Sequence, residues 1–184
     1  MPEIETARLR LRHFNLNDFD YLFRLYSDAE VMRYLSPRTR EQTQASLSKH
    51  IQQWQQHNFG MWAVIYKETG TMIGRCGLGF LENTKEVELG YVFDKSYWNM
   101  GLATEASLAT LKFGFWEVKL DRIVAMPTAG YAYAHPENIA SVRVIQKVGM
   151  KYEKNATYYG HDVVYYAVSH TEWQPDDSLY ISQS

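Results

Sequence analysis

Cysteine is almost missing from this chain of 184 residues, and neither charge sign dominates it. Cys76 is the only cysteine, so an intramolecular disulfide is impossible, and we expect it to be a small core residue. With 19 basic and 21 acidic side chains the formal net charge is -2. A charge this mild does not suggest nucleic acid or an anionic membrane surface as an obligatory partner.

Long apolar runs and metal-ligand spacings are missing as well. The sequence has no signal-like N-terminus and no span apolar enough for a membrane helix, so we expect a cytoplasmic protein with no membrane partner. Its 6 histidines show no paired helical spacing with a matching acid, so we expect no metal. Gly77-Leu78-Gly79 lacks the third glycine and following helix of a dinucleotide-binding motif.

The pattern of apolar residues predicts a mixed α/β domain. The length fits one domain over 1–173, followed by a polar tail over 174–184. Segments whose apolar residues recur at every second position, as in strands, are interspersed along the chain with segments whose apolar residues have helical spacing. We expect strands at 8–14, 61–66, 71–80, 86–93, 120–126, 152–158 and 163–171. We expect helices after Asn15 or Asn17, at 39–57, from 102 and at 138–148. The strand at 120–126 should run parallel to the one ending at Asp94, because a helix connects them.

The stretch 98–106, WNMGLATEA, joins a predicted strand to a helix that we expect to be amphipathic. Gly101 lets the backbone approach a ligand closely. The unpaired amides of the first helical turn, together with the helix dipole, suit a phosphate or pyrophosphate. The sequence therefore predicts an anion-binding turn that needs no lysine.

WNMGLATEA resembles the acyl-CoA pyrophosphate loop of the GCN5-related N-acetyltransferases (GNAT), in particular the ribosomal-protein N-terminal (RimJ/RimL-type) subgroup. In that family the loop begins with Arg or Gln, where this chain has Trp98. Further matches follow in order: Asn138-Ile139-Ala140-Ser141 resembles the family's Asn-x-x-Ser helix, and Lys147-Val148-Gly149 its exit. With the TARLRLR segment, the Glu88-Leu89-Gly90-Tyr91 strand and the closing 163–173 run, the resemblance covers nearly all of 4–173.

The resemblance implies a GNAT fold, with a mostly antiparallel sheet that contains one splayed parallel pair. It also implies acetyl-CoA (coenzyme A) as co-substrate, without a metal. Backbone groups near the splayed strand end and the loop would bind the pantetheine arm and pyrophosphate, and side chains of the Asn-x-x-Ser helix would contact the arm. The residues implied are Val92, Phe93, Asn99, Met100, Gly101, Leu102, Ala103, Thr104, Asn138 and Lys147. Asn138 is equally a helix N-cap, and Lys147 equally a cation that suits a helix C-terminus.

Two side chains are candidates for proton transfer. Strand alternation puts Glu88 on one face with Gly90 and Val92, where apolar neighbours raise a carboxyl pKa. It would act as the base through water, although a salt-bridged strand acid is the alternative; Glu86 is the less favoured choice. Ser141 resembles the family's serine near the coenzyme sulfur, where its hydroxyl would protonate the thiolate.

The acceptor side has fewer signals. By resemblance, the break that contains Tyr34 and Arg38 forms one wall of the acceptor pocket. The 127–137 segment is longer than in related proteins and carries Tyr131, Tyr133 and His135. It is either a tolerated surface insertion or part of the acceptor pocket or a homodimer contact.

We expect direct acetyl transfer to a primary amine, with a protein or peptide N-terminus as first candidate. Small amines such as polyamines, aminoglycosides and amino-acid analogues are the alternative acceptors. A non-catalytic acyl-CoA-binding regulatory module is the competing class, against which Glu88 and Ser141 argue.

Overall fold

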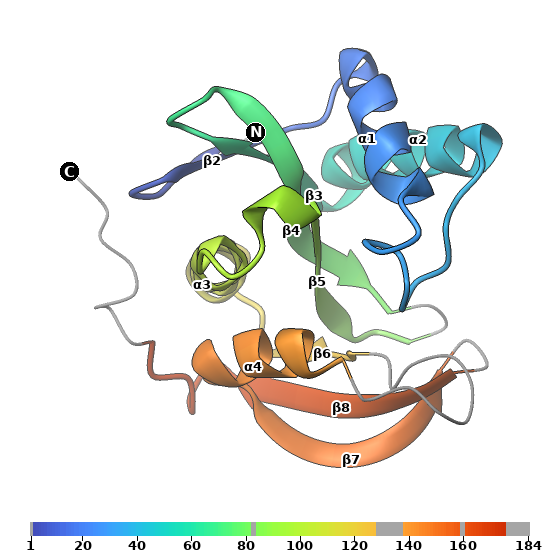
Figure 1. The fold of residues 1–184 in the computed structure, drawn as a ribbon. Helices are drawn as coiled ribbons and strands as arrows, with labels where there is room; N and C mark the ends of the chain where they lie inside the picture. Colours follow the sequence, from blue (N-terminus) through green and yellow to red (C-terminus); the bar gives the residue numbers. More distant parts are fainter. Residues whose placement is uncertain (1, 82–83, 128–137, 159–160, 176–184) are drawn as a thin grey trace.

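The computed structural model describes residues 2–81, 84–127, 138–158 and 161–175, and Figure 1 draws their fold. The strands are β1 (Ile4–Glu5), β2 (Leu9–Arg12), β3 (Met61–Tyr66), β4 (Thr71–Phe80), β5 (Val87–Phe93), β6 (Arg122–Ala125), β7 (Lys151–Tyr158) and β8 (His161–Ser169). The helices are α1 (Phe19–Ser27), α2 (Arg40–His57), α3 (Leu102–Trp116) and α4 (Ile139–Lys147). Among the described residues, no helix is both long and apolar enough to cross a membrane.

The strands form one sheet in the order β1-β2-β3-β4-β5-β6-β8-β7. Neighbouring strands pair antiparallel except β5 and β6, which run parallel and are bridged between Glu88 and Val124. Beyond this bridge β5 continues to Phe93 while β6 ends at Ala125, so the two strands separate. The predicted mixed α/β fold, with a mostly antiparallel sheet and a splayed parallel pair, is confirmed.

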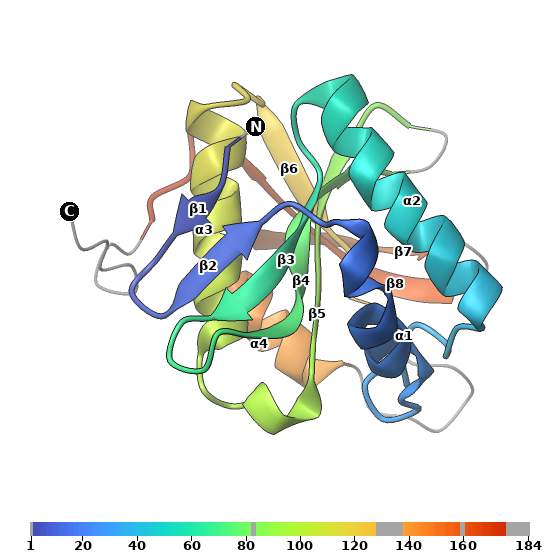
Figure 2. The same ribbon diagram turned by 90° about the horizontal axis from the view of Figure 1, so that it is seen from above.

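The helices cover both faces of the sheet, with α1 and α2 on one side and α3 on the other, as Figure 2 shows. Their ends follow ordinary capping chemistry. Thr39 caps the start of α2, where its hydroxyl oxygen accepts a hydrogen bond from the Gln42 amide. The side-chain oxygen of Gln42 in turn accepts a hydrogen bond from the Thr39 amide. Gly149, with φ of 89°, follows α4 in the left-handed conformation expected of a helix stop.

Helix α3 is the centre of the fold, and here the expectation of an amphipathic helix was wrong. Its buried residues lie all round the helix and include the polar Thr104, Glu105, Ser107 and Thr110. A helix that is apolar on every side belongs inside a protein. It packs against β2, β4, β5, β6 and α4, so only its end at Trp116 is exposed.

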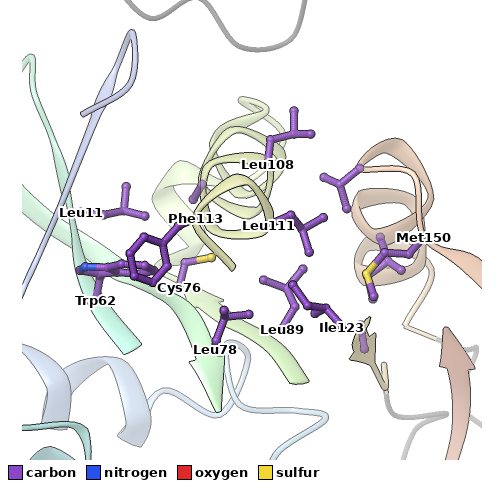
Figure 3. Close-up of a cluster of buried hydrophobic side chains, with 14 of the residues drawn as sticks. Leu11, Trp62, Cys76, Leu78, Leu89, Leu108, Leu111, Phe113, Ile123 and Met150 are labelled. Atoms are coloured by element: carbon purple, nitrogen blue, oxygen red, sulfur yellow. The ribbon is translucent and has the colours of Figure 1, made fainter. Parts of the chain in front are cut away.

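Figure 3 shows the apolar side chains that lie between α3 and the sheet. Phe113 of α3 meets Trp62 of β3 edge-on, with ring centroids 5.0 Å apart. Cys76 is fully buried beside them, as expected for a core residue, and burial raises the pKa of its thiol to about 11. Each large side chain buried here contributes roughly 2 kcal/mol of transfer free energy to folding. This layer fixes the start of α3 relative to β5.

The last hairpin differs from the prediction. We expected the last strand to begin at 163, but His161 and Asp162 already belong to β8 and pair with Tyr158 and Thr157. The Thr157 hydroxyl donates to the Asp162 carboxylate at 3.1 Å, and this cross-strand contact extends the ladder toward the turn.

Candidate active site

The loop before α3 has the backbone conformation of an anion-binding turn. Asn99 and Gly101 both have positive φ, 61° and 77°, and Gly101 is the N-cap of α3. The Glu105 amide is bonded to the Gly101 carbonyl at 3.1 Å. The amides of the three residues between them therefore have no partner within the helix: Leu102, Ala103 and Thr104. These three donors and the helix dipole make a site for a phosphate group.

Two side chains anchor this loop. Trp98, which stands where the GNAT pattern has Arg or Gln, donates from its indole nitrogen to the Phe93 carbonyl at 2.9 Å. Arg8 donates to the Met100 carbonyl at 2.8 Å and to the buried Glu105 carboxylate at 2.7 Å. The sequence did not single out Arg8, because its partners lie more than ninety residues away and no local pattern connects them.

The free edge of β5 follows from its pairing with β4. The Asp94 amide donates to the Ile73 carbonyl at 2.8 Å, so Asp94 faces β4. Because backbone groups alternate along an antiparallel strand, those of Val92 also face β4. The backbone groups of Tyr91 and Phe93 face the opening between β5 and β6 instead. Of the two residues that the sequence suggested for this edge, Phe93 lies on it and Val92 belongs to the ladder with β4.

Glu88 lies on the face of β5 that points toward α2, half-buried, in the same register set as Gly90 and Val92. Burial raises the pKa of its carboxyl to about 7, although the positive charge of Arg75 and a hydrogen bond from the Met126 backbone oppose the shift. At neutral pH the group is therefore divided between acid and carboxylate, which suits a general base. Glu86 sits at the start of the strand, 3.8 Å from Arg122, in an ordinary ion pair.

A cavity of about 830 Å³ opens beside Glu88. Its walls come from the connection between α1 and α2, from α2, and from β4 and β5. Arg38 lines it, whereas Tyr34 is not among the residues that line it. Glu88 is the only carboxylate among its described lining residues. Three cations line it as well: Arg38, Lys49 and Arg75.

The opposite face of β5 carries a hydroxyl pair. Tyr91 and Ser141 hydroxyls lie 2.7 Å apart, and the Tyr91 hydroxyl also donates to the Ser141 carbonyl at 3.2 Å. Burial raises the pKa of Tyr91 well above its ordinary value, so the phenol stays protonated. Sequence reasoning identified Ser141 but missed Tyr91. The available signal was its odd position on the strand, which puts it on the other face from Glu88.

Helix α4 positions Ser141. The Asn138 side chain accepts a hydrogen bond from the Ser141 amide at 3.1 Å and so caps the helix. Lys147 lies exposed in the last turn, where a cation suits the helix dipole. Tyr133 and His135, proposed from the sequence for the acceptor side, lie outside the described residues. Within the described ranges no group of three or more His, Cys, Asp or Glu side chains is arranged to hold a metal ion.

Comparison with known proteins agrees with this geometry. The acetyltransferase (GNAT) domain family matches residues 8–151. The chain is 33% identical over 178 residues to an uncharacterized N-acetyltransferase of Bacillus subtilis, YnaD. The aligned region covers 92% of this chain and 98% of YnaD.

Solved structures are similar over the same length. An acetyltransferase of the GNAT family from Bacillus anthracis superposes with a TM-score of 0.77 at 31% identity, over 93% of this chain and 100% of that one. The ribosomal L7/L12 alpha-N-protein acetyltransferase RimL, solved in complex with coenzyme A, gives a TM-score of 0.75 at 21% identity, over 91% and 98%. At that identity the likeness to RimL concerns the fold alone.

Proposed function

The chain belongs to the GNAT family of acetyltransferases, and from that premise we propose how its own residues transfer an acetyl group from acetyl-CoA to a primary amine. One observation carries the proposal. Glu88, a carboxyl group with a pKa of about 7, lies on one face of β5 where that strand leaves β6. The hydroxyl pair of Tyr91 and Ser141 lies on the opposite face. A base for the amine and an acid for the thiolate are the two groups that this reaction requires.

The coenzyme fits the other side of the same strand. We assign its pyrophosphate to the free amides from Gly101 to Thr104, with Asn99 and Met100 shaping the loop before them. We assign its pantetheine amides to the backbone edge of Tyr91 and Phe93, which the coenzyme would extend like an added strand. The Phe93 carbonyl already accepts from the Trp98 indole, so the groups offered there are the Phe93 amide and the backbone groups of Tyr91. The Asn138 oxygen is engaged in the helix cap, so its amide hydrogens are what remain for the arm. A contact from Lys147 stays a prediction.

The coenzyme supplies the thioester, and the chain moves the protons. Glu88 takes a proton from the ammonium form of the acceptor, directly or through a water molecule, and leaves a neutral amine. As the new C–N bond forms and the C–S bond breaks, a backbone amide at the β5 edge stabilises negative charge on the carbonyl oxygen. The Tyr91 and Ser141 hydroxyls donate a proton to the departing sulfur, and the second proton that the nitrogen loses as the amide forms restores the hydroxyl through solvent. Because no side chain carries the acetyl group, the transfer is direct.

A peptide N-terminus is the first candidate for the acceptor, because the cavity beside Glu88 is open and large enough for the end of a chain. A small-molecule amine is the second, since the same cavity would enclose one. A non-catalytic acyl-CoA-binding module would not need a carboxyl group with a raised pKa beside an acceptor-sized cavity, and Glu88 therefore favours an enzyme.

The test has two parts. Coenzyme A should raise the melting temperature of the purified protein, because a ligand that binds only the folded state stabilises it. Acetyl-CoA with a panel of peptides and small amines should then release thiol and yield acceptors heavier by one acetyl group in mass spectrometry. Stabilisation by coenzyme A without thiol release on any acceptor would favour the binding module. No stabilisation by coenzyme A would overturn the proposal.

A further inference from the structure

Arg75 is an unusual cation in this cavity. It lies in β4 and is only 8% exposed, and its Nε has no hydrogen-bond partner in the described structure. Its Nη1 contacts the Met61 sulfur at 3.3 Å, and no carboxylate in the described ranges forms an ion pair with it. Buried charges are ordinarily paired, because leaving them unpaired costs several kcal/mol. The charge of Arg75 acts on Glu88 from beyond ion-pair distance, and its Nε remains a donor for an anion that comes from outside the chain.

A second arginine stands beside the first. The guanidinium carbons of Arg38 and Arg75 lie 4.5 and 5.7 Å from the centroid of the same Tyr26 ring. Burial lowers the pKa of Arg38, and the nearby charge of Arg75 lowers it further. The effect of Arg75 on the pKa of Arg38 means that the two cations repel each other, and a shared anion would relieve the repulsion.

The other groups that face the arginines do not neutralise them. His50 is buried, and its pKa lies well below its ordinary value because of burial and then the charges of Arg75, Arg38 and Lys49. It is therefore neutral and bonded to the Tyr26 hydroxyl at 3.4 Å. With Lys49 on α2, three cations face a single carboxylate, Glu88, among the described residues that line the cavity. The lining is positive even when Glu88 is ionised.

The anion site is close to the base. A Cβ atom built on Gly90 would lie 3.7 Å from Arg75 Nη1, so the guanidinium reaches across Gly90. Gly90 and Glu88 are two residues apart on one face of β5, which separates them by roughly 7 Å. Gly79, the cross-strand partner of Glu88, adds no side chain between them, and the flexible end of Met61 lies over both glycines, where a ligand would displace it. A ligand that touched both Arg75 and Glu88 would have its anionic group only a few bonds from its amine.

We propose that the acceptor is a primary amine with a carboxylate a few bonds from the nitrogen, and that Arg75 and Arg38 bind this carboxylate while Glu88 takes the proton from the amine. The proposal rests on the proposed acetyl transfer and names its substrate class. Arginine suits this task because its planar donors match the two oxygens of a carboxylate. Polyamines and aminoglycosides carry the wrong charge for this lining. Free amino acids and peptides with an acidic first residue share the required chemistry.

The experiment compares matched acceptors at saturating acetyl-CoA. One arm pairs free amino acids with their carboxamides, and the other pairs peptides that begin with Asp or Glu with peptides that begin with Asn or Gln. In at least one arm the carboxylate should raise kcat/KM by about tenfold to a hundredfold, the usual effect of a charge-assisted hydrogen bond. The arm that responds identifies the source of the carboxylate.

Variants test whether the arginines cause this preference. Arg75→Met and Arg38→Met should each reduce the ratio of kcat/KM between the carboxylate acceptor and its neutral partner about tenfold or more. The ratio is the readout because the charge of Arg75 also acts on the pKa of Glu88 and so affects both acceptors. Arg75→Lys should restore part of the preference. The ratio between matched acceptors is informative even if a variant is less stable, because loss of folded protein lowers both rates equally.

Two outcomes overturn the inference and leave the proposed function intact. One is acetylation of neutral or cationic amines with no advantage for a carboxylate in either arm. The other is a preference that survives in both methionine variants. Acetylation of neutral or cationic amines alone, and of no amine that carries a carboxylate, is the extreme form of the first outcome. The proposed function itself fails if coenzyme A does not bind, or if acetyl-CoA releases no thiol with any acceptor.

Discussion

On the α3 side of strand β5 the proposed binding groups are backbone amides, held by a loop with two positive φ angles, whereas on the α2 side they are side chains from four separate elements. The first arrangement suits a ligand part that never changes, since every residue type except proline supplies the same backbone N–H group. The second changes with any single substitution. A common co-substrate and a variable acceptor would produce this division. The predictions below test it, beginning with the largest expected effect.

Gly101→Val should abolish coenzyme binding and leave the groups on the acceptor side in place. Valine at φ of 77° is strained, and its Cβ would lie 3.5 Å from Nη2 of Arg8, one of the side chains that anchor the loop. We expect the Kd for coenzyme A to rise on the order of a hundredfold or more, measured by titration calorimetry. Gly70→Val is the matched control, because Gly70 has a similar φ of 66° and no neighbour within 4 Å. Equal coenzyme binding in the two variants would remove the loop from the site.

Glu88→Gln should slow acetyl transfer without weakening coenzyme binding. We expect kcat to fall about a hundredfold while the coenzyme Kd stays constant, because a general base is lost. Glu86→Gln, on the same strand, should retain nearly full activity. A wild-type rate in Glu88→Gln would end the assignment of Glu88 as base.

The same variant should become more stable at high pH. In the folded protein the pKa of Glu88 is about 7 rather than its ordinary 4.5, so ionisation costs stability as the pH rises through this window. Glu88→Gln removes that cost and should gain roughly 1 to 3 kcal/mol at pH 8, but almost nothing below pH 4.5. Chemical denaturation at the two pH values measures the difference. An equal effect at both would mean that the carboxyl titrates normally.

Tyr91→Phe should reduce kcat by about tenfold, since its hydroxyl pairs with that of Ser141. Ser141→Ala should have a similar effect, and the double variant should be little worse than either, because the two hydroxyls act as one unit. Single-turnover rates measure this step apart from coenzyme release. Fully multiplicative losses would show that the hydroxyls act separately.

Trp98→Phe should have the smallest effect. This substitution removes the 2.9 Å hydrogen bond from the indole nitrogen to the Phe93 carbonyl and keeps an aromatic side chain at the position. We expect the Kd for coenzyme A to rise severalfold, consistent with one net hydrogen bond of about 1 kcal/mol. The exposed Trp116, changed to Phe, serves as control. No difference between the two variants would mean that the indole does not anchor the loop.

The sequence indicated more of the proposed coenzyme side than of the proposed acceptor side, and the reason is physical. Gly101, the following helix and the Asn138 cap are contiguous, so their geometry follows from local turn and helix rules. Tyr91 and Arg8 act through partners fifty or more residues away, which only tertiary packing brings together. In the sequence, Arg75 is one residue within a predicted apolar strand. Its position over Gly90 depends on the register between β4 and β5. The predicted amphipathic pattern of α3 failed because the helix is enclosed by neighbours that no local window contains.

The pH dependence of acetyl transfer tests the central claim most directly. With two acceptors whose amines have different pKa values, kcat in the wild-type protein should rise with pH through one limb near pH 7 that is the same for both, because it belongs to Glu88. Glu88→Gln should lose that limb, and Glu86→Gln should keep it. A limb that moved with the pKa of the acceptor, or one that survived in Glu88→Gln, would contradict the account.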